Sequence, residues 1–144
     1  MYALVDNSII FLFHVLCYDI WYYIIHQILH SRHFYFIHKK HHKQLYTNIT
    51  YLDTYSGEII EFPLQTLGVS FPLLIEKEKE QKFSLFIYAL IFITIRNLLE
   101  HDKRFAWLVG KHHLLHHQYP NHNFGEAWID YTFGTIYYKI DKTC

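Results

Sequence analysis

Three apolar stretches organise the first two thirds of the chain, and polar residues flank or interrupt each one. They run from residue 9 to about 25, from 59 to 75 and from 83 to 95. The third is the most apolar, yet as a helix it covers only about 20 Å of a hydrocarbon core roughly 30 Å thick. It needs Leu98 and Leu99 to come near crossing. The pattern predicts helices that enter a membrane, although none of the three is a clean span.

The middle stretch contains Glu61, Pro63, Gly68 and Pro72, and it therefore suits a kinked or re-entrant segment better than a straight helix. The charged run EKEKEQK, residues 76–82, follows it and predicts a solvated turn.

No repeat or low-complexity linker divides the 144 residues, a length that suits one domain, and strand signals are few. The N-terminus lacks a basic region followed by a cleavage site, so the apolar residues after Asn7 are expected to remain in the mature protein. The sequence predicts an all-α, membrane-embedded helical bundle, with residues 1–144 forming a single domain.

Charge and cysteine content exclude several classes of protein. Lys plus Arg and Asp plus Glu each number 13, so no basic surface for nucleic acid is expected. Cys17 and Cys144 form neither a disulfide framework nor a zinc-ribbon spacing, which fits a reducing, cytosol-facing site.

Histidine also numbers 13, and eight of these residues fall into three boxes. They are His26 and His30 in HQILH, His38, His41 and His42 in HKKHH, and His113, His116 and His117 in HLLHH. An HxxHH pattern is expected by chance only about 0.1 times in such a chain, yet it occurs twice. Residues three and four apart share a helix face, so each box is expected to point its imidazoles toward a common point. Eight imidazoles exceed the needs of one four-coordinate zinc and predict two metal ions.

Five histidines lie outside the boxes. His101, at the end of the third apolar stretch, is expected to reach the same face as the boxes, whereas His122 follows Pro120 in a predicted loop. His14 is interpreted as a core or interface residue. Two that adjoin boxes, His33 and His112, are left open as ligands, ligand-orienting groups or solvated residues.

Asp19 falls on the same helical stripe as Tyr23, His26 and His30. One interpretation is that it accepts a hydrogen bond from a ligand imidazole and so orients it. The other is that the stripe is a buried polar surface facing a neighbouring helix.

The setting favours iron over the other metals that neutral imidazole suits. A hydrocarbon-facing site offers few bonds to hydrolyse, and C–H bonds demand redox chemistry that zinc cannot supply, although zinc can substitute for iron in a structure. An alternative is a histidine-rich metal-binding or transport protein of the membrane. A transporter is expected to place such residues in the middle of its spans, whereas here they cluster at segment ends.

A shared metal centre constrains the topology. The chain between His42 and His101 must leave and return to the same side, so the second and third apolar stretches are expected to form a hairpin. Cations gather around the boxes, which predicts a metal site that faces the cytosol. They are Arg32, Lys39, Lys40, Lys43, Lys103, Arg104 and Lys111.

These residues resemble the fatty acid hydroxylase and sterol desaturase superfamily, whose members share HxxxH, HxxHH and a later HxxHH on a membrane-embedded helical bundle. DIWYYIIHQILH resembles the Asp and Tyr that precede the family's first box, and EHDKR is similar to the His-Asp of the sterol C5-desaturase branch. NFGEAWIDYTFGT resembles the closing Asn-[Tyr or Phe]-Gly, Trp-x-Asp and Phe-Gly-Thr pattern. The resemblance runs from Asp19 to Thr135.

The resemblance implies that the eight boxed histidines, with His101 as a ninth, bind two iron ions. It also implies ligand-orienting roles for Asp19, Asn97 and Asp130. Members of the superfamily use O2 and electrons from NAD(P)H, often through cytochrome b5, to hydroxylate or desaturate a fatty acyl chain, ceramide or sterol. An integral membrane protein is implied, located in the endoplasmic reticulum in a eukaryote.

Three features depart from the family pattern. Asn97 occupies the first position of an additional HxxxH that fatty acid 2-hydroxylases carry, Gln27 replaces a frequent Arg, and the chain is shorter than most relatives. A catalytically degenerate member is therefore a further alternative, against which the intact set of boxed histidines argues.

Overall fold

A computed structural model describes residues 2–43, 48–75 and 79–137, and within these ranges the chain is helical, with no strand. The α-helices are α1 (Tyr2–His30), α2 (Tyr35–His38), α3 (Glu61–Thr66), α4 (Lys79–Glu100), α5 (Ala106–Val109), α6 (His112–Gln118) and α7 (Ala127–Phe133). Short 3-10 helices span His41–Lys43, Tyr51–Asp53, Leu67–Leu74 and Lys103–Phe105. The predicted all-helical class is confirmed.

Within the described ranges, two helices are long and apolar enough to cross a membrane, over Asn7–His30 and Phe83–Glu100. α4 is longer than the apolar pattern indicated because it continues through Arg96 and Asn97 without a break. Both polar side chains find partners on α1, since Arg96 donates to Asp19 and Asn97 donates to Tyr18. These contacts remove the cost of two unpaired polar groups in an apolar helix.

The middle apolar stretch is kinked, as predicted. α3 gives way to the 3-10 helix Leu67–Leu74, which contains Pro72 and packs against α1. At Gly68 the two backbones approach so closely that a Cβ would lie 2.3 Å from the Cβ of Trp21. His14 of α1 donates from Nδ1 to the Val69 carbonyl at 2.6 Å, so this histidine is a packing residue.

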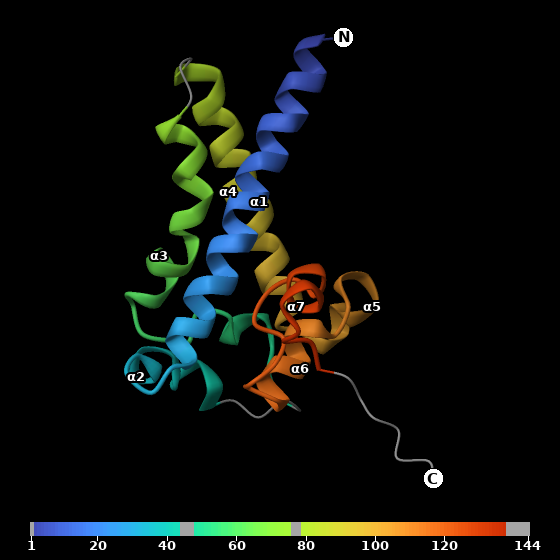
Figure 1. Cartoon of the computed structure of the whole chain (residues 1–144). Coiled ribbons are helices and arrows are strands. Elements are labelled where there is room, and N and C mark those ends of the chain that lie inside the picture. The colour runs from blue at the N-terminus through green and yellow to red at the C-terminus, as the bar shows by residue number, and fades with distance from the viewer. Residues whose placement is uncertain (1, 44–47, 76–78, 138–144) are drawn as a thin grey trace.

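The predicted hairpin is present. The segment from α3 to Leu74 runs beside α1, and α4 returns beside both (Figure 1). The expected turn over residues 76–82 is only partly right, because α4 already begins at Lys79. Residues 76–78 lie outside the described part of the chain.

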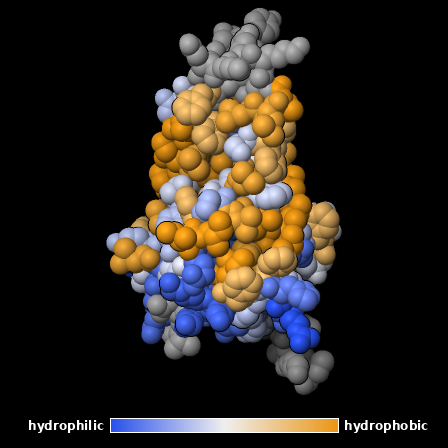
Figure 2. Space-filling model, turned by 90° about the vertical axis from the view of Figure 1, so that its left-hand side faces the viewer, coloured by the Kyte–Doolittle hydropathy of each residue, from blue (hydrophilic) through white to orange (hydrophobic). Residues whose placement is uncertain are grey.

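The apolar surface of the bundle faces outward. Only 28% of the apolar window on α1 and 11% of that on α4 is buried, far less than the core helix of a soluble protein requires. Exposed side chains include Ile9, Leu12, Ile20, Ile24 and Ile28 on α1 and Tyr88, Ile91 and Ile95 on α4. Figure 2 shows hydrophobic residues along the upper and middle part of one face and hydrophilic residues at the lower end. The exposed belt fits contact with lipid.

Candidate metal centre

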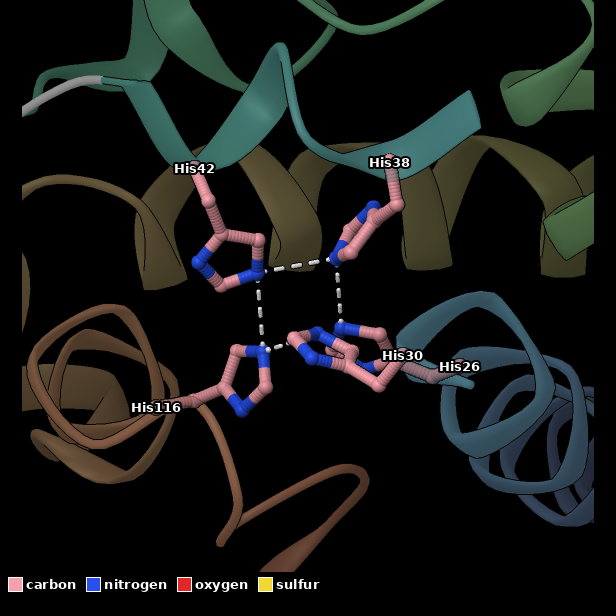
Figure 3. Close-up of side chains that lie close together, drawn as sticks. All are labelled: His26, His30, His38, His42 and His116. Carbon is pink, nitrogen blue, oxygen red and sulfur yellow. Dashed lines mark hydrogen bonds between the residues drawn. The ribbon is translucent and has the colours of Figure 1, made fainter. Parts of the chain in front are cut away.

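Nine histidines meet at one end of the bundle, and they are the nine that the sequence predicted as ligands. The five-histidine group comprises His26, His30, His38, His42 and His116 (Figure 3). The four-histidine group comprises His41, His101, His113 and His117. Within each group one ring nitrogen per residue lies within 4.8 Å of all the others, an arrangement that could hold a metal ion.

The boxes do not correspond to the groups. α2 ends at His38, and a separate 3-10 helix begins at His41, so the second box is not one continuous helix. Its His38 and His42 join the five-histidine group, whereas His41 joins the other. The third box is divided as well, since only His116 of α6 joins the five-histidine group. The expectation that the imidazoles of each box converge on one point is therefore wrong for the second and third boxes.

In the five-histidine group the Nε2 atoms form a chain of close contacts (Figure 3). The separations are 3.0 Å from His26 to His38, 2.9 Å from His38 to His42, 3.1 Å from His42 to His116 and 3.1 Å from His116 to His30.

In the four-histidine group the Nε2 atom of His101 lies 3.0 Å from that of His41 and 3.0 Å from that of His113. The His117 ring lies 4.7 Å from the His41 ring between centroids, and it also lies 4.7 Å from the ring of His42 in the other group. The two groups are thus adjacent.

Several Nε2 atoms present lone pairs to one another. Nδ1 of His26 lies 2.6 Å from the Phe124 carbonyl oxygen, and Nδ1 of His38 lies 2.6 Å from a Glu61 carboxyl oxygen. The Phe124 carbonyl can only accept, so the proton of neutral His26 lies on Nδ1 and its Nε2 is bare; ionised Glu61 fixes His38 in the same way. The 3.0 Å contact between the Nε2 atoms of His26 and His38 is then no hydrogen bond. The two lone pairs repel each other, whereas a cation between the two nitrogens would be coordinated by both.

The spacing also matches a metal ion with more than four ligands. Two ligands about 2.1 Å from a metal ion lie about 3.0 Å apart at a right angle and about 3.4 Å apart at the tetrahedral angle. The Nε2 separations run from 2.9 Å to 3.1 Å, so the right angle fits better. Both groups therefore fit metal ions.

Burial and neighbouring imidazoles keep the site neutral. Burial lowers the pKa of His42 to about 3 and that of His101 to about 4. It also lowers the pKa of His113, His116 and His117 well below the ordinary value, and nearby imidazoles add to the effect. Neutral imidazole is the form that binds a metal ion.

Glu61 is a functional candidate that sequence reasoning missed. It lies at the start of α3, is 5% exposed, and holds the Nδ1 of buried His38. Burial raises the pKa of Glu61 to about 7. The available signal was a carboxylate inside an apolar stretch, which requires a partner when it is buried.

The three polar residues expected to orient ligands lie in different places. Asp19 differs most from expectation: it pairs with Arg96, at 2.5 Å, and not with an imidazole in the described part of the chain. Arg96 also reaches Glu126, at 3.3 Å. The interpretation of a polar stripe facing another helix fits this arrangement. Asn97 does support a histidine, because its backbone carbonyl accepts from His101 Nδ1 at 2.8 Å.

Asp130 acts one step away from the histidine groups. Its carboxylate accepts hydrogen bonds from the backbone N–H groups of Phe124 and Gly125, from the Thr135 hydroxyl and from His112. Burial alone would raise the pKa of Asp130, but these hydrogen bonds hold it below its ordinary value. The loop fixed in this way supplies the Phe124 carbonyl to His26.

The remaining histidines have separate roles. His122 contributes its backbone carbonyl, which accepts from His116 Nδ1 at 2.7 Å, and its ring belongs to neither group. His112 donates to Asp130, and His33 is exposed. Asn123 lies between the two residues whose carbonyls hold His116 and His26. Its φ is 58°, a conformation that Asn tolerates better than most residues.

The fold and site define a helical membrane protein with two adjacent histidine groups at one end of its bundle. The profile of the family described as "Fatty acid hydroxylase" matches residues 11–135. The chain belongs to the fatty acid hydroxylase family. Comparisons with curated proteins and with solved structures returned no significant match.

Proposed function

We propose that the nine histidines hold two iron ions and that the protein hydroxylates or desaturates a membrane lipid with O2. The observation that carries this proposal is the pair of adjacent groups of neutral imidazoles, in which Nε2 atoms approach one another to 3.0 Å. Family membership supports a hydroxylase-type oxidoreductase. Iron bound there supplies the one-electron chemistry that O2 activation and C–H oxidation require.

The residues of the chain bind and orient. Nε2 atoms serve as ligands, and acceptors behind the rings fix their direction, as outer partners of metal-bound histidines do. Glu61 and the carbonyls of Phe124 and His122 hold three rings of the five-histidine group, and the carbonyl of Asn97 holds one ring of the other.

An apolar wall borders the five-histidine group. The Phe124 ring lies 5.4–5.9 Å from the rings of His26, His30 and His116, and it is 8% exposed. Such a wall limits the entry of water to the reacting groups and favours an apolar substrate.

The substrate proposed is a fatty acyl chain, ceramide or sterol, since the centre lies at the end of two lipid-facing helices. Two electrons and two protons balance hydroxylation: one oxygen atom enters the C–H bond and the other leaves as water. A cytochrome b5-type or other NAD(P)H-linked donor would supply the electrons. Exposed cations near the site, among them Arg32, Lys39 and Lys43, favour a cytosolic orientation, in the endoplasmic reticulum of a eukaryotic cell.

The test is expression of the full chain in a heterologous membrane, with lipid profiling by mass spectrometry and metal analysis of the purified protein. We expect a new hydroxylated or unsaturated lipid and about two iron ions per chain. His41→Ala should abolish the product while membrane insertion is kept. His33→Ala, which changes an exposed histidine outside both groups, is the matched control. Product formed by His41→Ala at the unmodified rate would refute the ligand assignment.

A further inference from the structure

A cavity of about 500 Å³ lies between α1 and α7, and none of the nine gathered histidines lines it. Ile20 and Ile24 of α1 form one wall, and Trp128, Thr132 and Phe133 of α7 form the other. The volume lies within the range of sites for small organic ligands. None of the described residues that line this groove is charged.

The groove is apolar along most of its length and polar at one end. Ile20 and Ile24 are within the candidate span of α1 and are 45% and 44% exposed, so this wall continues the lipid-facing surface of the helix. One turn further toward the histidines, Gln27 Nε2 donates to the Tyr23 hydroxyl at 2.9 Å. That hydroxyl lies 3.2 Å from the Thr135 hydroxyl. The polar end therefore lies at the end of α1 that carries the metal centre.

This polarity matches that of a lipid in the adjoining leaflet. Its head would lie near Gln27 and Tyr23, and its chain would follow Ile24 and Ile20 toward the middle of the bilayer. Because the polar end offers only amide and hydroxyl groups, it suits an uncharged head that carries hydroxyl or carbonyl oxygens. An anionic head would lose hydration there without meeting a cation.

The groove is separate from the metal centre. Tyr23, Phe124 and Ile129 pack together as a buried cluster between the two. Tyr23 also stacks on Phe133, with ring centroids 5.3 Å apart. A lipid in the groove would contact Tyr23 and Ile129 of this cluster, whereas the histidines contact its Phe124 ring.

We propose that the groove between α1 and α7 binds the acyl chain of an uncharged lipid, with the lipid head at Gln27 and Tyr23. The site requires neither metal nor turnover, so it can be tested independently of the proposed oxygenase activity.

The probe is a diacylglycerol with a photoactivatable diazirine in its acyl chain, bound to the purified full chain in nanodiscs of zwitterionic phospholipid. We expect saturable labelling, mapped by mass spectrometry to Ile20, Ile24 or Thr132. Unlabelled diacylglycerol should compete about tenfold better than phosphatidic acid of the same chain length. Labelling spread over exposed residues of α1 and α4 without saturation, or equal competition by both lipids, would overturn the proposal.

Matched variants sharpen the test. Ile24→Trp fills the groove and should reduce labelling there about tenfold. Ile91 of α4 is 50% exposed, close to the 44% of Ile24. Ile91→Trp therefore makes the same change outside the groove and should leave labelling unchanged. If Ile24→Trp fails to fold, Thr132→Phe fills the groove from α7. Labelling that survives in a folded groove-filling variant contradicts the proposed site.

Discussion

The two histidine groups differ in how firmly their rings are held. In the five-histidine group, His26, His38 and His116 each donate from Nδ1 to an oxygen atom. In the four-histidine group, His101 has such an acceptor. By contrast, Nδ1 of His41 and both ring nitrogens of His117 are buried without a hydrogen-bond partner among the residues that the structure describes.

This difference suggests unequal metal sites. A ring whose tautomer and orientation are already fixed loses less conformational freedom when it binds a metal ion. A hydrogen bond from its Nδ1 also makes the Nε2 atom a more basic ligand. We expect the five-histidine group to bind its ion more tightly. The four-histidine group supplies fewer protein ligands and should exchange its ion more readily.

Removing one ligand from each group should have the largest effect. His116 contacts both His30 and His42, so His116→Ala should release the more tightly bound ion and lower product formation at least about 100-fold. His117→Ala should also stop turnover but leave the tighter ion in place. Stepwise removal of metal by a chelator measures both, with His122→Ala as the control. If His116→Ala kept the more tightly bound ion, the five-histidine group would not be the tighter site.

Asp130→Asn should destabilise the fold by about 3 kcal/mol, because an amide oxygen cannot replace a carboxylate that accepts four hydrogen bonds. Thr135→Val removes one of these bonds and should cost about 1 kcal/mol. Denaturation in detergent measures both.

The stabilisation by Asp130 should depend on pH. The folded-state pKa of Asp130 lies below its ordinary value of 3.8. The stability that the carboxylate contributes is therefore present above that pH and is lost as the pH falls through the lower folded value. The variant should therefore differ least from the parent in strong acid, and an equal difference at every pH would contradict this role.

Glu61→Ala should weaken metal binding about 10–100-fold, because His38 loses the acceptor behind its ring. Glu61→Gln keeps an oxygen acceptor and should lose less. Gln65→Ala is the control, since Gln65 donates to Glu61 at 3.3 Å and belongs to neither group. Competition with a chelator gives the affinities. Equal losses in the Ala and Gln variants would show that the hydrogen bond does not orient His38.

Asn97→Ala should have the smallest effect. It removes the 2.7 Å bond to the Tyr18 hydroxyl and should cost about 1 kcal/mol of stability. Metal affinity should not change, because the backbone carbonyl that holds His101 remains. Tyr18→Phe should cost a similar amount, and the double variant little more than either single one. A drop in metal content would assign Asn97 a more direct role.

The local signals in the sequence predicted the nine gathered histidines, the helical class and the hairpin. His26 and His30 lie four residues apart on one continuous helix, which simple periodicity captures. The division of HKKHH between two helices could not be read in this way, because the backbone breaks after His38. His41 and His42 are neighbours in the sequence, yet they serve different groups.

Partners distant in sequence were the harder part. The Phe124 and His122 carbonyls carry no residue-type signal, since every residue has a carbonyl. Asp19 lay on the expected stripe, but the stripe does not indicate that Arg96, 77 positions away, is its partner. Glu61 was visible as a polar interruption, and only the packing of α3 against α1 shows what it faces.

The contact between His26 and the Phe124 carbonyl joins residues 98 positions apart, and this has a consequence for biosynthesis. During translation α1 emerges and inserts long before the ribosome has made the loop that fixes its first ligand ring. The newly made chain therefore carries the His26 ring without its support for most of its synthesis, and in the proposed function iron loading would follow the arrival of residues 113–130.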